Sequence, residues 1–485
     1  MKAHSRRTTG RGILPFAMKP GTTDKVTAHA GLPLVVEALR ALRLDEVIRQ
    51  KLRVSKRRRG YSELAKIEAL VTLLSAGGNR VEDIQILADD EGLLRLLGRR
   101  FPSPDALLDF LGGFHDASLW EQRPKGETSW VPPESAPLSA LGEVNEELVA
   151  RAVDSEARTA TIDHDGTVIE SHKQGATLAY EGTRGYQPLV AVWAEEDLIV
   201  ADEFRDGNVP GGKDPLASVR RAFEALPEQV TKRYFRGDSA DYYTALLKYL
   251  VKEGIQFSIS ADMTKELRAC CTKTPKGQWQ EFERREREVV DLAEVEFTPG
   301  NWPRNAEPLR YVAMRFTARQ GELFEDEEKV RYLAVVSNRR ELSMKELVRW
   351  HWGKAGTIEH VHRVMKDELG AGVFPSQHFG ANAAWFRCNV IAYNLLTLLR
   401  RRVLPKRYQN ARPKRLRFEI FTLPGLLAMP QGKLTVSVST GEERFGELAA
   451  ARERLWLMRK ALANRKPRQF VTRTKSPMTY PASNP

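Results

Sequence analysis

The stretch Thr159-Ala160-Thr161-Ile162-Asp163-His164-Asp165-Gly166-Thr167 decides the fold class of this chain. Within it, Ala160, Ile162 and His164 alternate with threonine and aspartate residues, which is the two-residue period of a β-strand. The strand therefore carries Asp163 and Asp165 on the same side. Asp165 lies close to the end of the strand, where a turn begins at Gly166.

Strand and helix patterns alternate after this stretch. Further strands are predicted at residues 188–193, 198–204, 233–235 and 257–260. Helices are predicted between them, one starting at Asp214-Pro215 and one containing Tyr243, Leu246, Leu247 and Leu250. Right-handed crossovers allow the first and fourth strands to lie side by side. Asp238, which ends the fourth strand in Tyr234-Phe235-Arg236-Gly237-Asp238-Ser239, can then meet Asp165 at one edge of the sheet.

A third carboxylate lies on a predicted helix. At 100° per residue, Glu359, Arg363 and Lys366 share one face, and the opposite face is apolar. Trp352 joins the charged face if the helix extends back that far, although Gly353 weakens its start. Three acids that a fold can gather are what a two-metal phosphoryl-transfer site needs, because hard oxygen ligands hold the metals.

Each of these residues also fits a structural role. Asp165 can begin a turn, Asp238 can cap a helix, and Glu359 can pair with Arg363 on a surface helix. Asp163 is the alternative first acid, because it shares a side of the strand with Asp165. The pair His360 and His362 fits packing or DNA contact better than zinc, since no suitably spaced third ligand follows.

The charge is concentrated at one end of the chain. The 485 residues carry a net charge of +13, whereas residues 400–485 hold 20 Lys+Arg against 5 Asp+Glu, a net +15, so the remainder is near −2. A second basic run precedes the first clear helix: Lys51, Arg53, Lys56, Arg57, Arg58 and Arg59. A single charge run fits a solvated face equally well, but two runs together with the three acids indicate a polyanion partner, namely a nucleic acid.

Cysteine content and hydropathy predict the compartment. Cys270, Cys271 and Cys388 give neither a disulfide framework nor a zinc spacing. No apolar run is long enough for a membrane span, and no secretion signal follows the basic N-terminus. We therefore expect a reduced, cytoplasmic protein with no membrane association.

The predicted architecture is α/β, a mixed sheet flanked by helices. The expected parts are a basic, partly irregular arm (1–60), a helical domain for DNA binding or assembly (61–150), a catalytic core (156–261 and 338–400), a β-rich insertion (262–337) and a basic C-terminal region (400–485). Residues 122–145 are expected to form a linker or surface loop. The sequence does not separate a DNA-binding role of the helical domain from a dimer or scaffold role.

These motifs resemble the DDE transposases of bacterial insertion sequences. The signature of that group is Tyr, two residues, Arg, three residues, Glu, six residues and then Lys. Here Trp352 stands at the Tyr position, and Glu359 and Lys366 keep the spacing. Ala355 departs from the Arg, although Lys354 and Arg363 offer charge nearby. Asp165-Gly166-Thr167 and Arg236-Gly237-Asp238-Ser239 match the two aspartate segments. Residues 203–209 and 389–399 also resemble the insertion-sequence family numbered thirteen-eighty, and the similarity covers roughly residues 60–440.

The resemblance implies an RNase H-like fold, cut-and-paste DNA transposition and a nucleoid-associated protein of a bacterium. Asp165, Asp238 and Glu359 would hold two Mg²⁺ ions, for which Mn²⁺ can substitute. The protein would bind terminal inverted repeats and target DNA as a homodimer or higher assembly, cleave by hydrolysis, and join 3′-OH ends to the target. The expected DNA contacts are Lys366, Arg363, Trp352, Arg236, Lys173, Arg57, Arg58 and Arg59.

Three alternatives stay open at this point. An aromatic side chain of the insertion, Trp279 or Trp302, would stack on a flipped base, or would instead pack the insertion's own core. A catalytically inactive or domesticated transposase would bind DNA without cutting it. A different RNase H-like nuclease would act on hybrids or junctions.

Overall fold

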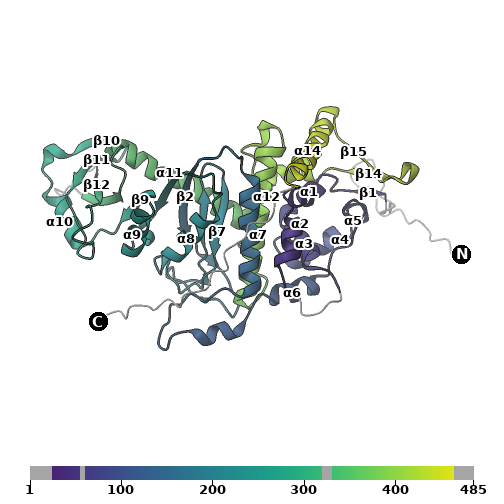
Figure 1. The fold of residues 1–485 in the computed structure, drawn as a ribbon, viewed down its shortest axis with the longest axis horizontal. Coiled ribbons are helices and arrows are strands. Elements are labelled where there is room, and N and C mark those ends of the chain that lie inside the picture. Colours follow the sequence, from purple (N-terminus) through teal and green to yellow (C-terminus); the bar gives the residue numbers. More distant parts are fainter. Residues whose placement is uncertain (1–24, 55–59, 319–329, 464–485) are drawn as a thin grey trace, which may run out of the picture.

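The computed structural model describes residues 25–54, 60–318 and 330–463, and it is built around one large sheet (Figure 1). The strand order is β10-β11-β12-β13-β9-β8-β2-β6-β7. The strands are β2 (Thr159–Gly166), β6 (Leu189–Trp193), β7 (Leu198–Glu203), β8 (Lys232–Gly237), β9 (Gln256–Ala261), β10 (Gln280–Arg284), β11 (Glu288–Val295), β12 (Arg310–Ala318) and β13 (Val330–Ser337). The predicted α/β class with a mixed, helix-flanked sheet is confirmed.

The centre of the sheet is parallel and its two wings are antiparallel. Strand β2 pairs in parallel with β8, and β8 pairs in parallel with β9. The predicted neighbourhood of the first and fourth core strands is therefore present. In this register Asp163 lies opposite Arg236. Two residues further along both segments, Asp165 is therefore level with Asp238.

The residues expected to form a β-rich insertion continue the main sheet. Strand β13 pairs antiparallel with β9, and β12, β11 and β10 follow outward. This pairing covers the backbone groups of β9 that an edge strand would leave exposed. Helix α10 (Lys265–Lys273) lies beside these strands at one end of the molecule (Figure 1).

Helices cover both faces of the sheet. Helices α8 (Pro215–Ala225) and α9 (Thr244–Lys252) follow the core strands, and α11 (Met344–Glu368) crosses the other face. Helix α11 is capped by Ser343 and runs uninterrupted through Gly353, so Trp352 and Glu359 share one helix. Helix α12 (Phe379–Leu398) stands beside β7 and is buried on all sides, because α3 and α6 pack against its outer face.

The N-terminal helices were predicted in part. Helices α3 (Glu63–Ala76), α4 (Ile84–Ala88), α5 (Glu91–Leu97) and α6 (Pro104–Gly112) lie within residues 61–150, which were predicted to be helical. Ser62 and Ser103 cap α3 and α6, and Gly77 ends α3 with a φ of +100°.

The prediction was wrong for three further helices. Helices α1 (Pro33–Ala41) and α2 (Leu44–Lys51) lie within the arm expected to be partly irregular, and α7 (Ala136–Ala152) begins within the expected loop 122–145. All three bury apolar side chains in one hydrophobic cluster that runs from Leu32 to Leu455. The amphipathic spacing was present in the sequence, but the Pro and charge content around it masked the helices.

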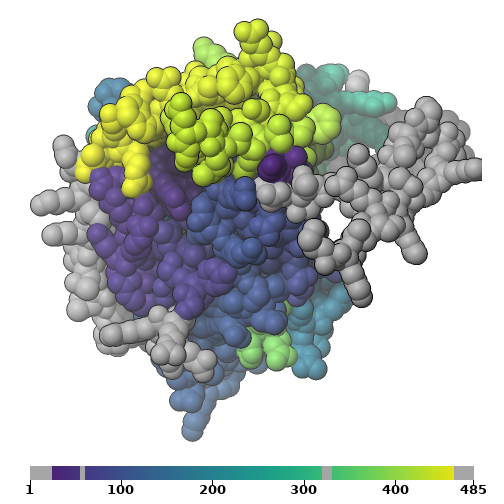
Figure 2. Space-filling view, turned by 90° about the vertical axis from the view of Figure 1, so that its right-hand side faces the viewer, coloured from purple at the N-terminus to yellow at the C-terminus, as the bar shows by residue number. Residues whose placement is uncertain are grey.

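The basic C-terminal region folds back onto the N-terminal helices as far as residue 463. Strand β14 (Gly425–Ala428) pairs with β1 (Val26–Thr27) and with β15 (Thr435–Val438), and α14 (Glu442–Ala461) packs on α1. Figure 2 shows this yellow segment lying over the purple N-terminal helices. Helix α13 (Pro413–Leu416) and short 3-10 or π turns connect the remainder.

Many C-terminal arginines are engaged within the chain. Arg452 contacts Glu37, Arg402 contacts Glu196, and Arg459 contacts Asp45. Within residues 400–463 of the predicted basic C-terminal region, much of the positive charge is therefore matched by carboxylates of the body. The net charge counted from the sequence therefore overestimates how much unpaired positive charge this region presents at the surface.

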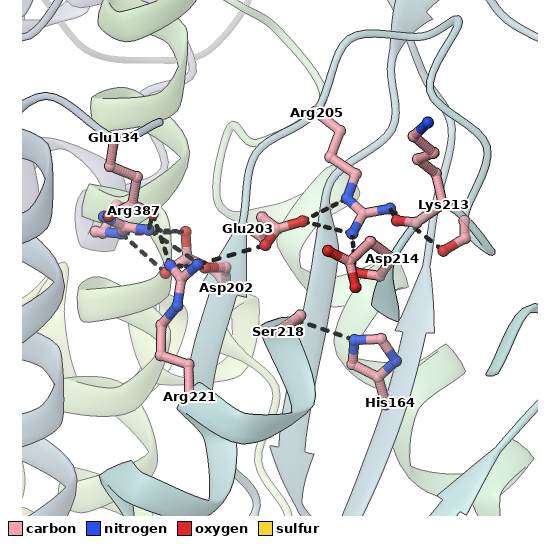
Figure 3. Close-up of polar contacts among 11 residues, drawn as sticks. Glu134, His164, Asp202, Glu203, Arg205, Lys213, Asp214, Ser218, Arg221 and Arg387 are labelled. Atoms are coloured by element: carbon pink, nitrogen blue, oxygen red, sulfur yellow. Dashed lines mark hydrogen bonds and ion pairs between the residues drawn. The ribbon is translucent and has the colours of Figure 1, made fainter. Parts of the chain in front are cut away.

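A buried ionic network joins β7, α8 and α12 (Figure 3). Arg387 of α12 donates to Asp202 at 3.0 Å and to Glu134 at 2.9 Å, and only 2% of its side chain is exposed. Arg221 of α8 bridges Glu134 and Glu203. Burial opposes ionisation of Glu134, but the two guanidinium groups hold its pKa well below its ordinary value.

We predict that Arg387→Ala destabilises the fold strongly. The substitution leaves Asp202, which is 4% exposed, without its cation, and loss of one partner of a buried pair costs about 3–5 kcal/mol. Arg452→Ala is the matched control, since the side chain is 66% exposed and such a pair contributes about 0–1 kcal/mol. Urea unfolding of the two variants gives the comparison, and equal losses would contradict the structural role of the network.

Candidate active site

Asp165 and Asp238 lie at adjacent strand ends. Asp165 is the penultimate residue of β2, and Asp238 directly follows β8. A 3-10 turn, Ser239–Asp241, begins after Asp238, whose Oδ1 accepts a hydrogen bond from the Ala240 N–H at 3.0 Å. Because β2 and β8 are parallel, both carboxylates meet at the carboxyl edge of the sheet.

The charges of these two acids interact. Burial raises the pKa of Asp165 to about 6, the nearby Lys354 opposes this shift, and the Asp238 carboxylate adds to it. The Lys354 ammonium lies 3.6 Å from Asp165 Oδ2. Two neighbouring carboxylates of this kind favour a bound cation, which would stabilise the ionised form of both.

Glu359 shares a cleft with Asp165. The cleft is about 380 Å³ in volume and is lined by Asp165, Gly166, Thr167, Glu359, His362, Arg363, Lys366 and Asp367. Glu359 is exposed on α11, whose buried face includes Ile358 and Val361. The helix therefore presents the acid to the cleft while its apolar face packs on the sheet.

The three acids are gathered in one region, but they do not form a closed ligand set. Within residues 25–54, 60–318 and 330–463, no group of three His, Cys, Asp or Glu side chains stands close enough to hold a metal ion. The donor chemistry still fits a hard divalent cation, since carboxylate oxygens are the ligands that Mg²⁺ and Mn²⁺ prefer.

Asp163 has a different partner from Asp165. Its carboxylate is fully buried and accepts two hydrogen bonds from Arg236, at 2.6 and 2.8 Å, and one from the Thr357 hydroxyl. Arg236 also donates to the backbone carbonyl of Trp350 at 2.7 Å. The absence of a side chain at Gly353 makes room, because a Cβ there would lie 2.6 Å from Arg236 Nη1.

This contact set fastens β2, β8 and α11 together. Asp163, the alternative first acid, is therefore saturated with internal partners, whereas Asp165 opens to the cleft. Arg236, expected at the DNA surface, is 6% exposed and turned inward. Its guanidinium neutralises a buried carboxylate and so has no exposed face for a phosphate.

The cations expected to contact DNA near the acids do lie at the cleft. Lys366 Nζ donates to the Thr167 hydroxyl at 3.0 Å, and Arg363 is exposed beside His360. Lys173 is exposed on the segment that follows β3 (Ile169–Glu170). Arg57, Arg58 and Arg59 lie outside the described residues.

The tryptophans expected to meet DNA pack within the protein. The Trp352 ring lies 5.3 Å from that of Phe282 and from the Arg285 guanidinium. Trp302 is 6% exposed and donates to the Glu307 carbonyl at 3.1 Å, while Trp279 packs on Tyr332 and Arg315. The alternative that Trp279 and Trp302 pack the β-rich region itself agrees with these contacts.

Sequence reasoning missed two features next to the acids. His164 points to the other face of β2, where it contacts Ser218 at 3.1 Å (Figure 3). It also contacts Asp241 at 2.8 Å, and all three residues are buried. Asp367 lines the same cleft as Glu359. The alternation of the strand placed His164 on that face, but its partners come from distant segments.

Comparison with protein families shows the class to which this chain belongs, the DDE transposases. The chain belongs to the family described as Transposase DDE domain group 1, whose model matches residues 21–459. It is thus a DDE transposase, a DNA-binding enzyme of transposition, and such enzymes generally use divalent metal ions.

The structure is similar to that of a piggyBac transposase in a synaptic complex with hairpin DNA, with 11% identity, a TM-score of 0.42, and coverage of 94% of this chain and 90% of that chain. No curated protein sequence matches. Every helix in the described parts of the chain is too short or too polar to cross a membrane.

We predict opposite stability effects for the two acids of β2 at pH 7 in metal-free buffer. Folding raises the pKa of Asp165 from 3.8 to about 6, so its contribution to stability is fully present below pH 3.8 and is lost as the pH rises through 6. Asp165→Asn is therefore expected to be as stable as the wild type or more so, by on the order of 2 kcal/mol.

Asp163→Asn, in contrast, leaves the buried Arg236 without a counter-charge and is expected to lose about 3–5 kcal/mol. Thermal unfolding at pH 4 and pH 7 measures both variants. A strongly destabilised Asp165→Asn at pH 7 would contradict the difference between the two sites.

Proposed function

We propose that this transposase acts by cut-and-paste, with Asp165, Asp238 and Glu359 as its catalytic acids. The observation that carries the proposal is the meeting of Asp165 and Asp238 at adjacent parallel strand ends, beside a cleft that Asp165 shares with Glu359. The motif spacing around Glu359 and membership of the DDE family support the same set.

The three carboxylates would hold two divalent ions, Mg²⁺ with Mn²⁺ as a substitute. When bound, these ions activate the attacking oxygen and stabilise the charge on the leaving one. The Lys354 ammonium lies 3.6 Å from Asp165 Oδ2 and favours the ionised form of this carboxyl. Burial and the adjacent Lys366 lower the pKa of His362 to about 3, so this ring stays neutral beside the acids.

The basic side chains around the cleft would grip the DNA backbone. Arg363 lies one helical turn beyond Glu359, and Lys366 lies on the wall of the same cleft. Lys173 extends this positive edge. In this arrangement the basic side chains would hold the scissile phosphate over the acids. A homodimer or higher assembly would bring the terminal inverted repeats and the target DNA together.

We predict that Glu359→Gln abolishes cleavage, by more than about 100-fold, and keeps DNA binding, because the amide is neutral and a poorer metal ligand. Asp367→Asn is the matched control from the same cleft and helix region, and it is expected to keep cleavage. The assay is cutting of a labelled duplex carrying the DNA that borders the reading frame, with Mg²⁺ or Mn²⁺, and Asp238→Asn beside the wild type.

The results of this assay identify the third acid and distinguish a catalytic enzyme from a DNA-binding remnant. Loss of cutting in Asp367→Asn but not in Glu359→Gln would move the third acid to Asp367. Tight binding of the end duplex by the wild type, with no cutting under either metal, would refute the catalytic proposal and favour a DNA-binding remnant.

We also predict that Arg363→Ala and Lys366→Ala each lower the slope of log K against log salt by about one, since each removes one phosphate contact. Lys252→Ala is the control, because this exposed lysine ends α9 at the opposite edge of the sheet. Fluorescence anisotropy at several salt concentrations gives the slopes. An unchanged slope for both cleft variants would place the DNA elsewhere.

A further inference from the structure

A small β-sheet stands on the same edge as the acids. Its strand order is β3-β5-β4, with β4 at Thr177–Leu178 and β5 at Arg184–Tyr186. Strand β3 follows β2 within three residues, and β5 leads into β6, whose Val190 lies opposite Asp165. The sheet is therefore anchored at both ends to the strands that form the candidate site.

The tip of this small sheet carries an exposed aromatic ring. Tyr180 is 75% exposed, and among the large hydrophobic residues of the described ranges only Phe418 is more exposed. The tip is a closed turn, since Ala179 N–H donates to the Thr183 carbonyl at 2.7 Å and Gly182 supplies a φ of +84°. The Tyr180 hydroxyl donates to Glu181 at 3.1 Å. A well-ordered turn thus presents a ring whose faces are open to solvent.

The ring lies within electrostatic reach of both aspartates. The pKa of Tyr180 is raised, first by its hydrogen bond to Glu181 and by burial, and further by the charges of Glu181, Asp165 and Asp238. The chain connections agree with this, because the small sheet begins just after the carboxyl end of β2 and leads into β6, the neighbour of β2. No such position is available to Trp302, which is enclosed in the β-rich region.

We propose that Tyr180 is a base-stacking residue that positions the DNA strand next to the scissile phosphate. Aromatic faces bind bases of any sequence, because every base has a flat π surface. An exposed ring on a rigid turn loses little conformational freedom when it stacks. Tyr180 is thus a positioning residue, and the inference rests on the proposed function because the acids beside it define where the strand is cut.

The test uses full-length protein and the end duplex, with 2-aminopurine in place of an adenine next to the cleavage position mapped with the wild type. Tyr180→Ala, Tyr180→Phe and the control Leu178→Ala are compared; Leu178 is 62% exposed on the same small sheet. Binding and fluorescence are measured in the Glu359→Gln background, and cleavage in the otherwise wild-type chain. Thermal unfolding confirms that each variant is folded.

We expect Tyr180→Ala to weaken binding about five- to a hundred-fold, the range for loss of one stacked base, and to change the 2-aminopurine fluorescence. Tyr180→Phe and Leu178→Ala are expected to behave as the parent protein. The inference is overturned if Tyr180→Ala binds, cuts and fluoresces as the parent, or if Tyr180→Phe loses as much as Tyr180→Ala. Failure of the wild type itself to cut would instead refute the proposed function.

Discussion

The parallel pairing of β2 with β8, fastened by the buried pair of Asp163 and Arg236, is the constraint on which the site depends. The bidentate contact fixes the relative height of the two strands. The same two side chains contact Thr357 and the Trp350 carbonyl, so α11 is held against the strands at a defined position. These contacts also fix the positions of Asp165, Asp238 and Glu359, because each acid lies a few residues after one of the contacting residues.

Charge is used differently in the two parts of the molecule. Around β7 and in the C-terminal region, arginines such as Arg387 and Arg402 are matched by carboxylates and bind distant segments together. At the cleft, Arg363 and Lys366 keep exposed or half-exposed positions. Positive charge that is already paired contributes little to the attraction of DNA, so the local arrangement at the cleft matters more than the net charge of the chain.

The accuracy of the sequence predictions varied with the strength of the local pattern. The strand around Asp165 and the helical segment that begins near residue 61 were predicted because strand alternation and helical spacing are local signals. Helix α7 was missed because a Pro- and Glu-rich segment precedes it, and its burial depends on contacts with β7 and α12. The strands of residues 262–337 were expected, but their continuity with the main sheet depends on the pairing of β13 with β9, which no local pattern contains.

The sequence by itself determined the α/β class, the family motifs and the three candidate acids, because these depend on residue type and spacing along one segment at a time. Tertiary structure alone decided which of two neighbouring aspartates faces the cleft. Asp163 and Asp165 share a side of β2, but only Asp163 meets Arg236, and that partner comes from a strand more than seventy residues away. It likewise decided that Trp302 is enclosed and Tyr180 is exposed, since burial depends on what packs around a side chain and not on the residue itself.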